Sequence, residues 1–344
     1  MGLNFKDLVV KKEISIKDLN GKILAIDSMN LLYQFLTTIR GIDGSVLTDS
    51  KGRVTSHLIG LFNRTTALME QGLKLVFVFD GKAPEIKQKT WEKRKVAKEE
   101  AALKLKAARE ENDLAEMKKF SSRTTVLNKE MIEDAKNLIW GLGLPIVQAP
   151  SEGEAQTAYM VKIGDAFASI SQDYDNLIFG CPVLIRNLSI AGKRKKKGTL
   201  VYQIVKPEAI LLDEVLDNLK LSLDQLIVLA ILVGTDYNPR GIKGIGPKTA
   251  LKYLQEYGDN FEEIFELVKW SEQYGIKWRE IFDTIKDIPV TEDYNLEWKK
   301  INEDYLLKLL VEGHEFGEQR VKTKLEKLRG EQSKLTQKGL SSFF

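Results

Sequence analysis

The chain has 344 residues, of which 43% are hydrophobic and 29% charged, a composition typical of a folded globular protein. Its longest apolar run, Leu226 to Val233, is far shorter than the roughly 20 residues that span a bilayer, and the N-terminus has no secretion-signal core. We therefore expect an intracellular protein with no membrane contact. A single Cys and two His exclude an internal disulfide and the usual Cys/His zinc sites, so any metal should be bound by oxygen.

The net charge of +3 hides an uneven distribution along the chain. Lys82 to Arg123 contains 13 basic and 8 acidic residues, Glu318 to Lys338 contains 7 basic and 3 acidic, and Lys193 to Lys197 is wholly basic. Pro150 to Cys181 instead has five acids and one base. Basic stretches around an acidic one suggest a polyanion held near a cation-loaded site, although any one basic run taken alone is more often a solvated helix face.

In chain order, three short apolar runs are followed closely by an acid: Ile23 to Ile26 by Asp27, Leu75 to Phe79 by Asp80, and Phe167 to Ser171 by Asp173. Such continuous runs are typical of buried parallel strands. They predict an α/β fold with a central, mainly parallel sheet flanked by helices. The acids then lie at the carboxyl ends of strands, the edge at which open α/β sheets bind ligands.

The remaining segments are mostly helical in pattern. We expect helices at Met29 to Arg40 and Ser56 to Gln71, and a long, polar, Ala-rich helix from about Lys87 to Arg123. LVYQIV after Thr199 suggests an edge strand. Further helices are expected over residues 207–269, interrupted near 234–246, with a possible capping box at Ser222 and Gln225. After Val321 the periodicity is lost, which indicates a mobile basic tail.

Seven acids attract attention as candidate ligands for metal ions: Asp27, Asp80, Glu152, Glu154, Asp173, Asp175 and Asp236. In an extended segment Asp173 and Asp175 point to one face, and adjacent carboxylates repel unless a cation or proton lies between them. Hard divalent cations bind such oxygen-only sets, so the pattern predicts two Mg²⁺ ions, for which Mn²⁺ should substitute. Two simpler readings stay open: Ser151 to Glu154 also fits a capping box, and Asp236 could be a turn former.

The segment from Gly241 to Ala250 is a glycine-rich turn that opens a helix. Pro247 makes a P-loop a poor match. A helix-hairpin-helix element would let backbone N–H groups near Gly244 and Gly246, together with Lys248, approach phosphates without reading base sequence. A plain helix–helix turn is the alternative.

Several further residues are candidates for DNA or protein contacts. Lys87 and Arg94 are seven residues apart, nearly two helical turns, so both could face one phosphate, or solvent. Tyr33 could stack on a base or pack in the core. The polar C-terminus ends in Gln337, Leu340, Phe343 and Phe344, and its aromatic residues suggest a groove on a partner protein or a disordered end.

In these residues and motifs, the chain resembles the flap endonucleases of the structure-specific 5′ nuclease superfamily, and looks most like an archaeal member. The resemblance covers nearly the whole chain and rests on AIDSMNLLYQF, VFVFDGKAPEIKQKTWEKR, APSEGEAQTAYM, SQDYDNLIFG, GTDYNPRGIKGIGPKTA and QKGLSSFF. It implies a nuclease fold with a helical arch that admits a 5′ flap and a helix-hairpin-helix type element that grips duplex DNA. The tail stops at Phe344, without the basic extension common in eukaryotic relatives.

The resemblance also implies roles for the candidate residues. The seven acids would be metal ligands, Lys87 and Arg94 the phosphate-facing catalytic pair, and Tyr33 a base-stacking residue. The C-terminal peptide is similar to the box that docks on a trimeric sliding clamp of PCNA type. The expected regions are 1–98 (N-terminal nuclease region), 99–123 (arch), 124–258 (internal nuclease region with the helix-hairpin-helix element), 259–320 (C-terminal helical region) and 321–344 (mobile tail).

These observations together predict a monomeric Mg²⁺-dependent endonuclease that removes 5′ flaps in Okazaki fragment maturation and repair, with accompanying 5′ exonuclease activity. It would work in the cytoplasm or nucleoid if the source is archaeal. Two other classes stay open. A non-catalytic, clamp-associated DNA-binding protein would have no need of seven acids. A phosphatase with an Asp nucleophile would explain Asp173 and Asp175 but neither the arch-like helix nor the tail.

Overall fold

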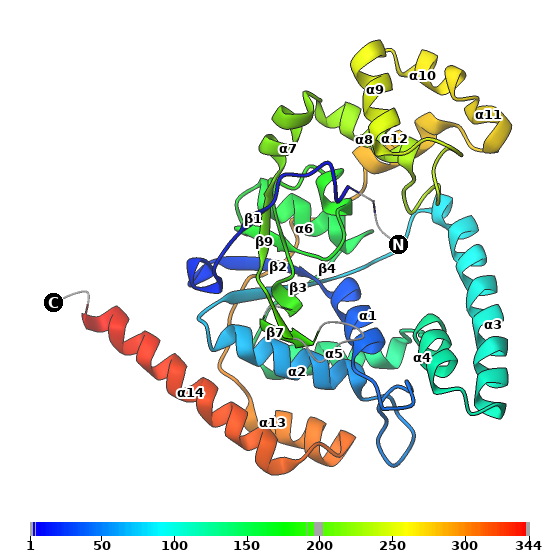
Figure 1. The fold of residues 1–344 in the computed structure, drawn as a ribbon. Helices are drawn as coiled ribbons and strands as arrows, with labels where there is room; N and C mark the ends of the chain where they lie inside the picture. The colour runs from blue at the N-terminus through cyan, green and yellow to red at the C-terminus, as the bar shows by residue number, and fades with distance from the viewer. Residues whose placement is uncertain (1–2, 4, 191, 196–201, 342–344) are drawn as a thin grey trace.

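The computed structural model describes residues 3, 5–190, 192–195 and 202–341 (Figure 1). The strands are β1 (Lys12–Glu13), β2 (Ile23–Asp27), β3 (Lys74–Phe79), β4 (Ile146–Gln148), β5 (Ala168–Ile170), β6 (Val183–Arg186), β7 (Gly192–Lys195), β8 (Tyr202–Val205) and β9 (Glu208–Leu211). Seven of these strands form one sheet, in the order β1-β9-β6-β5-β2-β3-β4. The run from β6 to β4 is parallel, and β9 and β1 extend it in antiparallel fashion. The predicted mainly parallel sheet is confirmed.

The helices surround this sheet. The α-helices are α1 (Ser28–Thr38), α2 (Ser56–Met69), α3 (Gln88–Glu110), α4 (Leu114–Arg123), α5 (Lys129–Gly141), α6 (Gly153–Lys162), α7 (Leu212–Leu219), α8 (Leu223–Val233), α9 (Pro247–Tyr257), α10 (Phe261–Leu267), α11 (Trp270–Gln273), α12 (Trp278–Lys286), α13 (Glu303–Leu307) and α14 (Glu318–Ser341). Short 3₁₀ turns are η1 (Ile16–Leu19), η2 (Glu85–Lys87), η3 (Asp175–Leu177) and η4 (Leu188–Ile190), and η5 (Lys308–Gly313) is a π-helical turn. In this described part of the chain, no helix is long and apolar enough to cross a bilayer.

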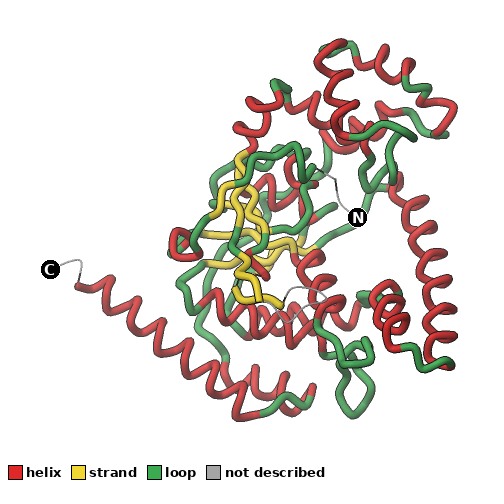
Figure 2. Tube along the Cα trace, viewed as in Figure 1, coloured by secondary structure: helices red, strands yellow, loops and turns green. Residues whose placement is uncertain are grey.

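The two faces of the sheet are covered differently, because neighbouring residues of a strand point to opposite sides. Leu24 and Ile26 of β2 pack in a cluster with residues of α1, α2, α5, α13 and α14. Ala25, between them, packs in a second cluster with α6 and an extended segment that contains Trp298. Figure 2 shows the resulting layers of helix, sheet and helix. Strands buried on both faces explain why their sequences read as unbroken apolar runs.

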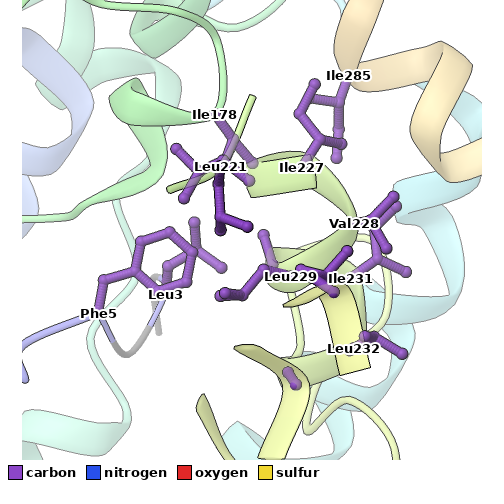
Figure 3. Close-up of a cluster of buried hydrophobic side chains, with 14 of the residues drawn as sticks. Leu3, Phe5, Ile178, Leu221, Ile227, Val228, Leu229, Ile231, Leu232 and Ile285 are labelled. Carbon is purple, nitrogen blue, oxygen red and sulfur yellow. The ribbon is translucent and has the colours of Figure 1, made fainter. Parts of the chain in front are cut away.

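A third hydrophobic cluster lies at the end of the molecule formed by α7 to α12 (Figures 1 and 3). Its centre is α8, in which Leu226 to Leu232 are all buried. Leu3 and Phe5 from the N-terminus pack into the same cluster. The predicted capping box begins this helix: Gln225 N–H donates to Ser222 Oγ, and Ser222 N–H donates to Gln225 Oε1. This cluster fixes the loop after α8, which carries Asp236, against the sheet domain.

The structure corrects two expectations about secondary structure and confirms a third. The segment from Lys87 to Arg123 is two helices, because Asn112 has a φ of 53° and the Asp113 side chain caps a new helix at Ala115 and Glu116. The expected edge strand in LVYQIV is confirmed as β8, which pairs only with β7 in the described chain and so belongs to a separate hairpin. Glu208–Leu211 is a strand of the main sheet, where a helix was expected.

The prediction of a mobile tail after Val321 is also wrong for the first part of that segment. Glu318–Ser341 forms the helix α14, and Val321, Leu325 and Leu328 are buried against the cluster that contains α2 and α13. Their spacing of four and three residues places them on one face of the helix. Beyond this face the helix extends away from the body of the molecule (Figure 1).

Candidate active site

The carboxyl ends of the parallel strands position most of the seven acids. Asp27 ends β2, where its Oδ1 accepts a hydrogen bond from Asn30 N–H at 3.0 Å and caps α1. Asp80 follows β3, and its Oδ1 accepts from Gly153 N–H at 2.7 Å. Asp173 and Asp175 follow β5, and Asp175 Oδ1 accepts from Leu3 N–H at 2.8 Å. The parallel strands bring these side chains to one edge of the sheet, as the sequence predicted.

The other acids come from helix ends. Glu152 is the N-cap residue of α6, and Glu154 lies in its first turn. The cap has no side-chain hydrogen bond, so the capping-box reading of Ser151 to Glu154 is wrong. Asp236 lies in the loop between α8 and α9. All seven acids line one pocket of about 370 Å³, together with Met29, Asn30, Tyr33, Lys87 and Lys98.

The pocket is strongly unfavourable for ionised carboxylates in the absence of cations. Burial, and then the charge of Asp80, raises the pKa of Asp27 to about 7. Burial, and then Asp236, raises that of Asp175 to about 7. Burial and the charges of neighbouring carboxylates also raise the pKa of Asp80 and Asp173. They raise the pKa of Glu154 well above its ordinary value. A site with this much buried negative charge needs positive charge to stay ionised.

Lys87 supplies part of that charge. Its Nζ is 2.5 Å from Glu152 Oε1 and 3.6 Å from Asp236 Oδ2. Burial alone would lower the pKa of Lys87, but the charges of Glu152 and Asp236 raise it. Lys87 ends the 3₁₀ turn η2, just before α3. The sequence predicted a lysine that faces phosphate or solvent, whereas the structure places its ammonium among the acids.

The donor set fits divalent cations by its chemistry. The charged groups in the pocket that can bind a metal ion are all carboxylates. Hard cations such as Mg²⁺ bind one or two carboxylates directly and keep several waters. Among the described side chains no three acids already form a set able to hold a metal ion. The ammonium of Lys87 lies between two of the acids instead. A cation held by Glu152 or Asp236 would therefore compete with Lys87 for these carboxylates.

Some pocket residues were not found by sequence reasoning. Asn30 Nδ2 donates to Asp173 Oδ2 at 2.7 Å, so Asn30 joins the start of α1 to the segment after β5. Lys98 of α3 lies over the ring of Tyr33, with its Nζ 5.8 Å from the ring centroid. Tyr33 itself is 38% exposed at the pocket, which excludes the core-packing alternative. Asn30 could have been found, since it occupies the first turn of the helix that Asp27 caps.

The glycine-rich turn joins two helices, as a helix-hairpin-helix element would. Helix α8 precedes it and α9 follows it, so no strand is present to support a P-loop. Gly244 has a φ of +85°, and a Cβ at Gly244 or at Gly246 would meet no atom within 4 Å. The backbone there is open to solvent, and Gly246 and Lys248 are exposed at the start of α9. An approaching anion would meet the N-terminus of α9.

Other predicted site residues are only partly described. Arg94 lies in α3, and Gln337 and Leu340 lie in α14, but their side chains are outside the description. Phe343 and Phe344 lie outside the described residues altogether. The structure therefore brings together the seven acids, Lys87 and Tyr33, and leaves these five residues as predictions.

Comparison with known proteins gives consistent matches along the chain. Residues 4–101 match the XPG N-terminal domain, and residues 143–236 match the XPG I-region. A curated relative, "Flap endonuclease 1" of Pyrococcus horikoshii, is 52% identical over 344 residues, which is 100% of this chain and 98% of the relative. That of Pyrococcus furiosus is 50% identical over 100% of this chain and 99% of its own.

A solved structure, flap endonuclease-1 from Methanococcus jannaschii, superposes with a TM-score of 0.75 at 42% identity and covers 96% of this chain and 98% of its own. The catalytic core of Rad2 in complex with DNA substrate has the same fold, with a TM-score of 0.67 at 22% identity over 92% of this chain and 96% of its own.

Proposed function

The chain belongs to the flap endonuclease 1 family and is a 5′ flap endonuclease, and from that premise we propose that it hydrolyses one phosphodiester at the junction of a 5′ flap with duplex DNA, assisted by two Mg²⁺ ions. One observation carries the proposal. Seven acids from separate segments of the chain line one pocket with Lys87. A protein that only bound DNA would have no use for this concentration of buried negative charge, which repels phosphate.

The acids would bind and orient the two cations. Asp27, Asp80 and Asp175 each accept a hydrogen bond from a backbone N–H group, which orients their carboxylates in the pocket. Bound divalent cations supply activation of the attacking water and stabilisation of the leaving 3′ oxygen. The donor set is compatible with Mn²⁺ in place of Mg²⁺.

Lys87 and Arg94 would stabilise negative charge on the phosphate. Lys87 is already in the pocket, and cations bound to Glu152 and Asp236 would weaken its attraction to these acids. Its ammonium then becomes available to a phosphate oxygen. Arg94 follows on α3, two helical turns further along the chain. Electrostatic stabilisation of this kind is worth about 3 kcal/mol for one well-placed group.

Other surfaces would hold the DNA. The exposed backbone at Gly244 and Gly246, with Lys248, would bind the phosphates of the duplex. Tyr33 would stack on a base next to the scissile phosphate. Helix α3 contributes Lys98 to the pocket and packs against α4 (Figure 1), and the two helices would form the arch that admits the single-stranded flap, so the arch would begin at Gln88 and not at residue 99.

The biological setting is part of the proposal. We place the enzyme in Okazaki fragment maturation and repair inside the cell, as a monomer with accompanying 5′ exonuclease activity. The peptide from Gln337 to Phe344 would bind a sliding clamp of PCNA type. Helix α14 would carry this peptide away from the nuclease body, since it extends outward beyond its packed face (Figure 1).

The test is cleavage of an end-labelled 5′-flap junction beside the same strand unpaired. We expect cutting near the base of the flap, on the junction alone, with Mg²⁺ and not with a chelator. Lys87→Ala and Arg94→Ala should each lower the single-turnover rate about a hundredfold while changing junction affinity less than threefold. Lys129→Ala, an exposed lysine of α5, is the matched control. Equal losses of rate and affinity would refute the catalytic role of the pair.

A further inference from the structure

Lys87 has an aromatic neighbour as well as acidic ones. Its Nζ lies 5.1 Å from the centroid of the Tyr237 ring, over the ring face. Tyr237 follows Asp236 directly in the chain, and only 6% of it is exposed. The Lys87 ammonium therefore contacts both the two acids and the face of the ring.

The loop holds the Tyr237 ring firmly in place. Tyr237 N–H donates to Thr235 Oγ1 at 3.1 Å, and Thr235 Oγ1 donates to Asn238 Oδ1 at 2.7 Å. Asn238 Nδ2 donates to Ile231 O of α8 at 2.7 Å. Thr235 and Asn238 are buried, and Tyr237 packs in the cluster centred on α8. The ring is therefore buried in a hydrogen-bonded turn that packs on α8, so its position does not depend on Lys87.

We propose that Tyr237 is a positioning residue, whose ring face keeps the Lys87 ammonium at the active site while substrate and cations are bound. This inference rests on the proposed role of Lys87 in the reaction. A lysine side chain has four rotatable carbon–carbon bonds and loses much rotamer freedom when its ammonium is fixed.

The acids can hold Lys87 only while they are free of other cations. If Glu152 and Asp236 held cations, their attraction for the ammonium would weaken, whereas the attraction of the ring face would persist. A cation over a desolvated aromatic ring gains about 1–2 kcal/mol, which corresponds to a five- to thirtyfold effect on the population of the productive position.

The test compares Tyr237→Phe, which keeps the ring, with Tyr237→Leu, which removes it. With saturating flap junction and Mg²⁺, Tyr237→Leu should lower the single-turnover rate about tenfold without changing junction affinity, and Tyr237→Phe should stay within twofold of the wild type. Phe282→Leu is the matched control, since Phe282 is a buried aromatic of the same cluster without contact to Lys87. Tyr237→Met, which conserves more volume, replaces Tyr237→Leu if the latter does not fold. Equal losses in the Phe and Leu variants would assign the effect to the hydroxyl and overturn the proposal.

A double-mutant cycle separates positioning from general support of the fold. In a Lys87→Ala background, Tyr237→Leu should cost no further rate, because the group that it positions is gone. The same tenfold loss in both backgrounds would refute the proposal. If Lys87→Ala alone leaves the rate unchanged, the proposed function of Lys87 fails, and that outcome is distinct from failure of the ring contact.

The ring contact can be measured without activity. In the metal-free protein, the Lys87 Hε–Cε NMR signal, identified by its loss in Lys87→Ala, should be shifted upfield by the ring current of Tyr237. The shift should persist in Tyr237→Phe, disappear in Tyr237→Leu, and remain when Mg²⁺ is added to the wild type. Loss of the upfield shift on addition of Mg²⁺ would show that the ring does not retain the ammonium, and would overturn the proposal.

Discussion

Replacing Asp175 by Asn should stabilise the metal-free protein while weakening its hold on Mg²⁺. Burial and the charge of Asp236 raise the pKa of Asp175 from 3.8 to about 7. Three pKa units correspond to about 4 kcal/mol, the free energy by which the ionised side chain destabilises the fold above pH 7. Asparagine removes the charge and keeps an oxygen that can accept the hydrogen bond from Leu3 N–H. We expect the free energy of unfolding to rise by about 2–4 kcal/mol at pH 8 without metal.

The sign of the pH dependence follows from the direction of the shift. The folded state holds a proton on Asp175 up to a pH of about 7, whereas the unfolded chain releases it near 3.8. The folded state therefore binds more protons between these values, and the wild type should lose this stability as the pH rises through that window. The Asn variant lacks this dependence. The advantage of the variant should be large at pH 8 and nearly absent at pH 4.

The assay is urea unfolding followed by tryptophan fluorescence, with chelator and then with Mg²⁺, at pH 5 and pH 8. Mg²⁺ should stabilise the wild type more than Asp175→Asn, because ligands that bind only the folded state stabilise it by mass action. Asp293→Asn, an exposed acid of the extended segment before α13, should change stability by less than about 0.5 kcal/mol and is the control. A variant no more stable than wild type at pH 8 in chelator would refute this account of the pocket.

Three further predictions concern separate parts of the molecule. Asp80→Asn should bind the flap junction normally but cut it at least about a hundredfold more slowly in Mg²⁺, and near-normal cutting would remove Asp80 from the metal site. Burial lowers the pKa of His57 from 6.5 to about 4, so the unfolded chain takes up the proton first and stability is lost as the pH falls below 6.5. Relative to His57→Leu, the wild type should therefore lose about 2 kcal/mol between pH 7 and pH 5 in urea unfolding, and parallel pH profiles would contradict this. Deleting residues 337–344 should abolish clamp binding in a pull-down and leave clamp-free cleavage unchanged; retained clamp affinity would place the contact elsewhere.

The positions of the acids could be predicted because they depend on local rules. Asp27 and Asp80 each end or follow a strand buried on both faces, and such strands read as continuous apolar runs. Parallel strands place their carboxyl ends at one edge of the sheet, so acids far apart in sequence had to meet there. Glu152 and Glu154 were less certain from sequence, because Glu154 also fits a capping box with Ser151 and Glu152 could complement the helix dipole.

The errors arose where a strong local signal concealed a weaker one. Helix propensity from Lys87 to Arg123 is high, and it concealed Asn112 and Asp113, a left-handed residue followed by an N-cap. In α14 the many lysines concealed the apolar spacing from Val321 to Leu328. That face becomes buried only because α2 and α13 lie beside it, which the sequence of the helix alone does not show.

The relation between Lys87 and the acids could not be read from sequence, since it depends on three segments meeting. Sequence reasoning treated Lys87 as a partner of phosphate and the acids as partners of metal, as two separate sets. The structure pairs them: the Lys87 ammonium contacts Glu152 and Asp236. Both sets are charged groups in a mostly buried pocket, and without ligands each must compensate the other. If the acids held cations, their attraction for Lys87 would weaken and its ammonium would become available to the phosphate, while Tyr237 would limit how far the lysine can move.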